Sequence, residues 1–470
     1  MSASVAQIRG ARLEGISPSK LGEISLIVGI ALAVLNFGGT EPVSFAVVEV
    51  FLIGVAAIFL AHPGRKELPL SREALLVPSL LLAVVLLQMC PLPVSMLRPT
   101  AAEGEGARFI PLTIEPFATR VHFLVLLACI IGFFLAQIAA QDPVRKRRLI
   151  VAIVTLGVFE GFYGLIQYLA GWQVIFGYVK KYDLEEATGT YINRNHYAGF
   201  LEMVFPFALV FALREFWKLQ KKTAQSLPNL KRLAVWSDVH KFVTWLAIAI
   251  SLFVALIYSR SRMGIIAALL SMIVIFALAW FSRSEGTAGI FVCAVFLALS
   301  VGLIVWIGAG SIVERFRGVA QEYVSRDYSR VSIWPNAVEV MRRHPWLGTG
   351  LGTFPIAYTT VQTNFLGEFV NHAHNDYLEL ASDLGIPAAL GLISSFIWLL
   401  ARAVRTSRAA IESLDRFLAL GCAGSLVAIL LHSLVDFNLY IPANSLLFAS
   451  ILGLTASLQS ERVSSASRTA

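Results

Sequence analysis

The chain has 470 residues, of which 57% are hydrophobic and only 14% charged, and its mean hydropathy is +0.72. This balance is more apolar than a water-soluble core of this length requires, so a lipid bilayer is the expected solvent. The formal net charge of +8 comes from basic residues dispersed among short polar segments, which excludes the concentrated basic face of a nucleic-acid-binding protein.

Apolar stretches long enough to cross a bilayer recur along nearly the whole chain. A helix needs ~20 mostly apolar residues to cross a hydrocarbon core of ~30 Å. We therefore predict an all-α polytopic membrane protein with about twelve spans. They lie at residues 22–39, 43–61, 74–90, 121–140, 149–170, 197–213, 242–258, 264–281, 288–308, 385–401, 417–435 and 445–459. The first run has no small-residue cleavage signal before the next one, so we expect a retained helix rather than a signal peptide.

The distribution of Lys and Arg predicts the topology, because basic residues near span ends are retained in the cytoplasm. Basic residues fill the second, fourth, sixth and tenth loops, whereas the connections at 38–42 and 436–444 have none. Both termini are therefore expected in the cytoplasm of a bacterial inner membrane. The long segments 91–120, 171–196 and 309–384 are then periplasmic, and the chemistry should lie there.

The strongest local motif is His372-Ala-His374-Asn375-Asp376-Tyr-Leu-Glu379, directly before the tenth span. Asp376 and Glu379 fit a capping box, which predicts a short helix immediately after the two histidines. The positive end of that helix favours a neutral imidazole, and a neutral histidine beside an anion site is suited to act as a general base. The alternatives are a solvated histidine pair or zinc, although further ligands at zinc spacing are not obvious.

A second motif, Thr188-Gly-Thr-Tyr-Ile-Asn193-Arg194-Asn195-His196, runs straight into the sixth span. On a helix Asn195, Gly199 and Glu202 share one face, and Arg194 lies at the membrane surface. A fixed cation there can hold a phosphate, or it can simply extend to water. The nearby acidic run Asp183-Leu-Glu185-Glu186 lies beside two lysines, and we interpret it as a charged surface turn rather than a metal site.

A third motif, Ser259-Arg260-Ser261-Arg262-Met-Gly264, forms a tight outward turn between the seventh and eighth spans. Two arginines outside the membrane run against the charge rule, so we expect something negative to compensate them, such as a phosphate held in a bidentate fork. Mere topological tolerance is the alternative. We expect some of the basic residues of the long loop to be ordinary solvated charges: Arg315, Arg317, Arg326, Arg330, Arg342, Arg343 and His344.

Several other polar features have plainer interpretations. The run Gly348-Thr-Gly-Leu-Gly352 follows no predicted strand, so we interpret it as a sharp turn rather than a dinucleotide-binding loop. The cysteines show no metal spacing and are expected to be core or lipid-facing side chains. Acidic and histidine residues within spans are costly in lipid and should face the bundle or a wet cavity. They are Glu49, Glu160, Glu202 and His432, with Asp436 at the outer end of the eleventh span.

Together, the stretches at 372–385 and 188–203 and the SRSRMG turn resemble the superfamily of O-antigen ligases and O-antigen polymerases. The resemblance extends to the predicted twelve spans and to the large outer loop before the tenth. It implies a glycosyltransferase of the GT-C type that inverts the anomeric configuration and uses no metal or other cofactor. The donor would be a glycan on undecaprenyl pyrophosphate, and the acceptor a hydroxyl of lipid A core, of another glycan or of a protein.

The resemblance also implies roles for individual residues. It places the general base at His374 or, as the second choice, His372, and the pyrophosphate clamp at Arg194 and at Arg260 or Arg262. Supporting positions are Asn193, Asn195, His196, Glu202 and Asn375. It divides the chain into a cytoplasmic N-terminus (1–21), an N-terminal transmembrane region (22–241), an O-antigen ligase-related core (242–401, with the periplasmic loop 309–384), two last spans (402–459) and a cytoplasmic tail (460–470).

Three alternative functions stay open at this point. A polymerase of the same superfamily would use the same donor and another acceptor. A transporter of lipid-linked sugars would also have about twelve spans and buried acids, although transporters concentrate charges at the midplane and commonly show repeated halves. A non-catalytic protein of envelope assembly would tolerate replacement of His374.

Overall fold

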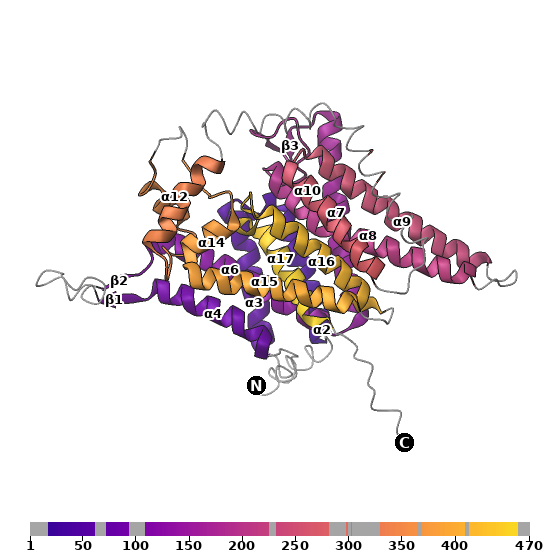
Figure 1. Cartoon of the computed structure of the whole chain (residues 1–470), viewed down its shortest axis with the longest axis horizontal. Coiled ribbons are helices and arrows are strands. Elements are labelled where there is room, and N and C mark those ends of the chain that lie inside the picture. The colour runs from indigo at the N-terminus through magenta and orange to yellow at the C-terminus, as the bar shows by residue number, and fades with distance from the viewer. Residues whose placement is uncertain are drawn as a thin grey trace, which may run out of the picture.

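The computed structural model describes residues 17–61, 72–93, 109–224, 232–281, 298, 302, 330–363, 369–408 and 413–458. These residues form a bundle of long helices with two short antiparallel hairpins (Figure 1). The hairpins are β1 (Pro91–Pro93) with β2 (Phe109–Pro111), and β3 (Val174–Ile175) with β4 (Tyr178–Val179).

The described residues form fourteen α-helices. In chain order the α-helices are α2 (Pro18–Leu35), α3 (Pro42–Ala61), α4 (Arg72–Met89), α6 (Pro116–Ala139), α7 (Pro143–Ala170), α8 (Arg194–Ala224), α9 (Arg232–Tyr258), α10 (Arg262–Phe281), α12 (Arg330–Arg343), α13 (Phe354–Thr359), α14 (Asp376–Leu384), α15 (Ile386–Ser407), α16 (Leu414–His432) and α17 (Pro442–Ser457). Two 3₁₀ turns, η1 (Phe37–Gly39) and η5 (Asn438–Tyr440), complete the described elements.

The prediction of an all-α polytopic membrane protein is confirmed. Within the described residues, nine helices are long and apolar enough to cross a membrane, and residues 74–89 and 442–457 form two shorter apolar helices. Each predicted span except the ninth overlaps one of these helices. The ninth, at 288–308, lies almost wholly outside the described residues, so the count of twelve stays a prediction.

The first predicted span is displaced by about one helical turn. It was expected at 22–39, but α2 begins at Pro18, where the Ser17 side chain accepts a hydrogen bond from the backbone N–H of Lys20. The helix ends at Leu35 because the chain turns at Gly38 and Gly39, whose φ values are +67° and +74°. Hydropathy averaged over about twenty residues does not resolve this end, because the next apolar helix begins only a few residues later, at Pro42.

Helix α8 forms the centre of the bundle, and its most apolar stretch is entirely buried. It packs against α7, α9, α10, α16 and α17. A helix without a lipid-facing side can contain polar groups only where other helices supply partners. The acid Glu202 on this helix is therefore expected to be paired inside the protein.

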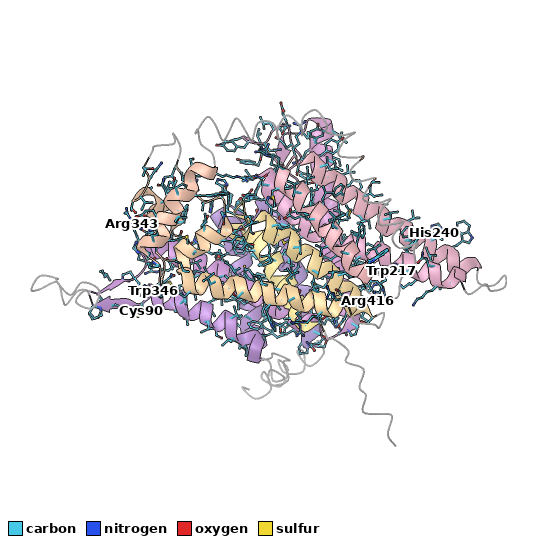
Figure 2. The ribbon with its side chains drawn as sticks, viewed as in Figure 1. Cys90, Trp217, His240, Arg343, Trp346 and Arg416 are labelled. Atoms are coloured by element: carbon cyan, nitrogen blue, oxygen red, sulfur yellow. The ribbon has the colours of Figure 1, made fainter. Side chains whose placement is uncertain are left out.

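The predicted outer and inner segments lie at opposite ends of the bundle. Figure 2 shows Cys90, Arg343 and Trp346 at one end, with Trp217, His240 and Arg416 at the other. This arrangement agrees with the alternation of basic and non-basic loops, and which end faces the periplasm stays a prediction. We call the end with Cys90 and Trp346 the outer end.

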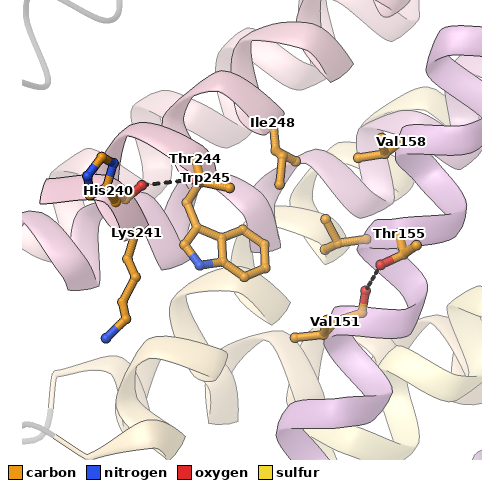
Figure 3. Close-up of a pocket in the computed structure, with 9 residues that line it drawn as sticks. Val151, Thr155, Val158, His240, Lys241, Thr244, Trp245 and Ile248 are labelled. Carbon is orange, nitrogen blue, oxygen red and sulfur yellow. Dashed lines mark hydrogen bonds between the residues drawn. The ribbon is translucent and has the colours of Figure 1, made fainter. Parts of the chain in front are cut away.

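A groove of about 400 Å³ between α7 and α9 lies near His240 and the inner end (Figure 3). Its walls are mainly aliphatic, with Trp245 and Lys241 at one side. The hydroxyl groups of Thr155 and Thr244 are bonded to the backbone oxygens of Val151 and His240, each at 2.8 Å. The groove therefore offers a surface for hydrocarbon rather than for polar chemistry.

Candidate functional site

The two histidines of the HAHNDYLE motif lie in a loop that is fixed by α14. The predicted helix is present, but its N-cap is Asn375, whose Oδ1 accepts hydrogen bonds from Tyr377 N (3.0 Å) and Leu378 N (3.1 Å). The capping box starting at Asp376 is therefore wrong by one residue. Asp376 is instead buried, and both its carboxylate oxygens accept from Leu439 N at 3.2 Å. Asn375 caps the helix with its side-chain amide oxygen, so the carboxylate of Asp376 is left to accept a hydrogen bond from the turn that contains Leu439.

Glu379 holds the loop from the other side. Its Oε2 accepts from the backbone N–H of Ala373 at 2.8 Å, and its Oε1 lies 2.7 Å from His372 Nδ1. Burial raises the pKa of the Glu379 carboxyl to about 8, and burial lowers the pKa of His372 to about 4. Both groups are therefore uncharged near pH 7, and His372 is already occupied by an orienting partner.

The turn after α16 docks onto the same loop. Asp376 N donates to Ser433 O (2.9 Å) and Asp436 O (3.1 Å), and Asn375 Nδ2 donates to Leu434 O (2.9 Å). These bonds join residues about sixty positions apart in the chain. Consequently the carboxylate of Asp436 comes to lie beside His374.

Three histidines and one arginine surround Asp436. Its Oδ1 lies 3.9 Å from His374 Nδ1 and 4.0 Å from His196 Nε2. Its Oδ2 lies 3.8 Å from His432 Nε2 and 3.3 Å from Arg330 Nη2, contributed by α12. Burial alone would raise the pKa of Asp436, but His374, Arg330 and the other two imidazoles hold it well below its usual range. Asp436 is thus a fixed negative charge at the centre of the cluster.

The ring of Phe437 packs the histidines together. It stacks on His372 at a centroid distance of 3.9 Å and an interplanar angle of 10°. It meets His374 and His196 edge to face, at 5.0 Å and 4.7 Å. Such contacts hold the imidazoles in defined orientations without supplying hydrogen bonds.

His374 differs from the other members of the cluster. Its φ is +49°, a left-handed conformation that non-glycine residues rarely adopt and that clusters at functional sites. Its Nδ1 is buried and faces Asp436 Oδ1 at 3.9 Å, with no described hydrogen-bond partner, while 22% of the side chain stays exposed, so a bound molecule can reach the ring only from the side away from Nδ1. This is the arrangement expected of an imidazole that can receive a proton from a bound molecule.

Two of the predicted clamp arginines, Arg194 and Arg260, have carboxylate partners in the structure. Arg194 Nη1 lies 2.6 Å from Glu186 and 3.4 Å from Asp183, and Arg260 Nη1 lies 3.6 Å from Glu185. The expected negative compensation is therefore present, and the acidic run does more than form a surface turn. Arg262 begins α10.

The structure brings together only part of the predicted set. His372, His374 and His196 meet at Asp436 and Phe437, Glu202 joins them through His432 at 3.0 Å, and Asn375 caps α14 directly after His374. Asn193 caps α8, since its Oδ1 accepts from Asn195 N at 2.7 Å. Arg194 and Arg260 instead contact the acidic turn, and Arg260 also donates to the Tyr168 hydroxyl at 3.3 Å. In the part of the chain that the structure describes, no group of three or more His, Cys, Asp or Glu residues is arranged to hold a metal ion.

Sequence reasoning missed the two residues that organise the cluster. Asp436 was noted only as an acid at the end of a span, and Arg330 only as one of several loop charges. Their one signal in the sequence is their position. Asp436 follows an apolar span, and Arg330 begins the short helix α12. No spacing along the chain connects them to His374, so only the fold reveals the contact.

A cavity of about 960 Å³ begins at His372 and Glu379 and extends between α3, α4, α6, α15 and α17. Its outer end is also lined by His196 and Phe437, and its far end by Arg402. The wall between these ends is largely aliphatic and aromatic. Among the described polar exceptions is Glu49, which lines the cavity as predicted for an intramembrane acid. The cavity thus joins a polar site to a hydrocarbon-like interior.

The sequence matches the family model for O-antigen ligase over residues 246–393. Residues 246–393 belong to the O-antigen ligase family. The O-antigen ligase region includes the two histidines of the motif, Arg260, Arg262 and Arg330, whereas His196, Glu202 and Asp436 lie outside it. The match supports glycan transfer of the ligase or polymerase type by a multi-pass membrane enzyme. No curated protein matches the chain.

Proposed function

We propose that this chain transfers a glycan from undecaprenyl pyrophosphate to an acceptor hydroxyl at the periplasmic face of the inner membrane. The reaction is ligase-like, inverts the anomeric configuration and needs no metal. The acceptor is a hydroxyl of lipid A core, of another glycan or of a protein. Polymerisation of the same donor is the second candidate, because the O-antigen ligase family match does not separate the two.

The observation that carries this proposal is the placement of His374, whose buried Nδ1 faces Asp436 of the Asp436 and Arg330 pair while 22% of its side chain stays exposed. In the proposed reaction the acceptor oxygen attacks the anomeric carbon while the bond from that carbon to the pyrophosphate oxygen breaks. The pyrophosphate leaves with the electron pair, and His374 takes the acceptor proton. Attack from the face opposite the leaving group inverts the configuration. A positioned base typically contributes about 10²- to 10⁴-fold in rate.

Arginines supply the positive charge that a leaving pyrophosphate requires. Arg330 contacts Asp436 and its side chain is 37% exposed, so part of its guanidinium is available to a second anion. Arg194, Arg260 and Arg262 would form the rest of the clamp, with phosphate oxygens replacing the carboxylates of the acidic turn. Glu185 is 84% exposed, so its exchange for a ligand costs little burial.

The cavity supports a donor that carries a long hydrocarbon chain. It starts at the histidine site and continues through aliphatic walls within the helical bundle. A polyprenyl chain placed there would put its charged head at the outer end, which His372, His196 and Phe437 line; His374 contacts Phe437, and Arg330 lies beyond it at Asp436. A transporter would instead need its charged groups near the midplane, and the cluster around Asp436 lies in loops and turns at helix ends.

The test is a comparison of His374→Asn with His344→Asn in a strain that lacks its own copy. His344 follows the last residue of α12 and stands outside the cluster, so it is a matched control. With equal membrane abundance, His374→Asn should accumulate lipid-linked glycan and lose the transferred product, while the control resembles wild type. The length pattern of the accumulated glycan separates a ligase from a polymerase. A wild-type product pattern in His374→Asn would remove histidine as the base and favour the transporter or assembly alternatives.

A further inference from the structure

A histidine that the proposed reaction does not use lies between two acids inside the bundle. His432 Nδ1 is 3.1 Å and 3.0 Å from the two carboxylate oxygens of Glu202, and His432 Nε2 is 3.8 Å from Asp436 Oδ2. The side chains of all three residues are at most 1% exposed. Glu202 comes from α8, His432 from the last turn of α16 and Asp436 from the turn that follows.

The number of protons on His432 follows from these two contacts. A neutral imidazole has one N–H, so one of its nitrogens would present a lone pair to a buried carboxylate. An imidazolium has two N–H groups and can donate toward both acids. Buried charges are retained only where they are paired, so the doubly protonated ring is the form that both carboxylates favour.

The charges of the cluster then balance. With His432 protonated and Glu202 ionised as a buried ion pair, the two carboxylates supply two negative charges, which Arg330 and the imidazolium match. No further positive charge is needed from His374. A base must be unprotonated before the reaction, so this balance has a direct chemical consequence.

We propose that Glu202 and His432 are positioning residues: they hold a buried imidazolium that, with Arg330, neutralises Asp436 and so leaves His374 unprotonated and ready to accept the acceptor proton. This inference rests on the proposed function, because it assigns His374 the role of base. It adds that the protonation of His374 depends on the paired charges of Glu202 and His432. The base depends on a pair of residues outside the O-antigen ligase region.

The other titratable groups that face this cluster do not disturb the balance. Burial raises the pKa of Asp376 well above its usual range and that of Glu379 to about 8, which favours the uncharged form of both acids. Burial lowers the pKa of His372 to about 4, so it is uncharged as well. The remaining group is His196 from α8, whose Nε2 contacts Asp436 at 4.0 Å and has no described hydrogen-bond partner.

The protonation of His374 can be measured without any transferase assay. Diethyl pyrocarbonate acylates the unprotonated imidazole, so the labelling rate at each pH gives the unprotonated fraction. The experiment uses the full chain in detergent as wild type, His432→Gln and the double variant Glu202→Gln/His432→Gln. Mass spectrometry of the labelled peptides resolves His374 from His372. Labelling of His344, which stands outside the cluster, controls for reagent and pH effects.

In His432→Gln two buried acids face one arginine, so His374 should take up a proton more readily. The midpoint of its labelling should move to higher pH by about one unit, the scale of shift that one nearby charge produces. The double variant removes one positive and one negative charge together, so its midpoint should return to within ~0.3 unit of wild type. A purely structural pair would not give this restoration.

An unchanged midpoint in His432→Gln, or a double variant displaced as far as the single one, overturns the proposal. If His432→Gln does not accumulate, Arg330→Gln with and without Glu202→Gln repeats the comparison with His432 intact, and the same two outcomes decide it. A separate result decides the proposed function. If wild-type chain labelled at His374 alone retains full glycan transfer, His374 is not the base, whatever the labelling midpoints show.

Discussion

Replacing Asp436 by Asn is the change with the most calculable effect on this site. Asn keeps the shape of the side chain and can still accept the hydrogen bond that Phe437 N donates to Oδ1 at 2.9 Å. It removes the negative charge that faces Arg330 at 3.3 Å and three imidazoles at 3.8 to 4.0 Å. The perturbation is therefore electrostatic, with little change in packing.

The expected loss of stability lies at the lower end of the range for a broken buried ion pair. Removing one partner of such a pair costs about 3–5 kcal/mol when the other charge is left without compensation. Arg330 keeps contact with water through its exposed part, so leaving it without Asp436 costs less than leaving a fully buried charge unpaired. We expect the free energy of unfolding to fall by about 3 kcal/mol. Transfer should fall by at least about 100-fold, because His374 loses the charge that holds it in place.

Unfolding in detergent followed by tryptophan fluorescence gives the stability, and transfer to acceptor in isolated membranes gives the rate. Asp415→Asn is the matched control, since Asp415 pairs with Lys146 at 2.6 Å near the inner end. The control should lose some stability and retain transfer. An Asp436→Asn chain that folds normally and transfers at the wild-type rate would refute the role assigned to Asp436.

Three further changes follow from the same contacts. Burial raises the pKa of Glu379 to about 8, whereas in the unfolded chain glutamate and histidine side chains are unprotonated above about pH 6.5. The folded chain therefore binds one more proton than the unfolded chain in this range, and its stability should fall as the pH rises from about 6.5 to 8. The thermal midpoints of Glu379→Gln should lack this fall. Phe437→Leu removes the stack on His372 and should cost about 1 kcal/mol in the same unfolding assay, with a larger effect on kcat than on KM. Glu186→Gln removes the nearer of the two carboxylates that pair with Arg194 and leaves Asp183 at 3.4 Å. KM for the lipid-linked donor should therefore fall severalfold if Arg194 binds pyrophosphate, and an unchanged KM would exclude Arg194 from the clamp.

The helical architecture was predictable from sequence because each span must bury its own backbone polar groups and present an apolar surface. Helix ends were less predictable. The chain leaves α2 at Leu35 through a turn with two glycines at positive φ, and α9 begins at Arg232, ten residues before its predicted span. In both cases the end depends on backbone conformation and tertiary contacts rather than on hydropathy.

The candidate site was predictable only in its local parts. The HAHNDYLE motif indicated both histidines and the helix after them, since a cap and its helix are neighbours in sequence. The pairing of His432 with Glu202 and the grouping around Asp436 join segments that are far apart in the chain. Such contacts depend on how α8 packs against α16, and one sequence contains no direct record of that packing.

The central claim is that this chain transfers a glycan from a lipid pyrophosphate with His374 as base. The most direct measurement incubates the purified chain, with EDTA present, with lipid-linked glycan and acceptor extracted from the same host. Free undecaprenyl pyrophosphate and glycosylated acceptor are quantified by mass spectrometry. We expect equal amounts of both products from wild type and a loss of at least about 100-fold in His374→Asn. Movement of intact lipid-linked glycan without cleavage, or equal transfer by His374→Asn, would contradict it.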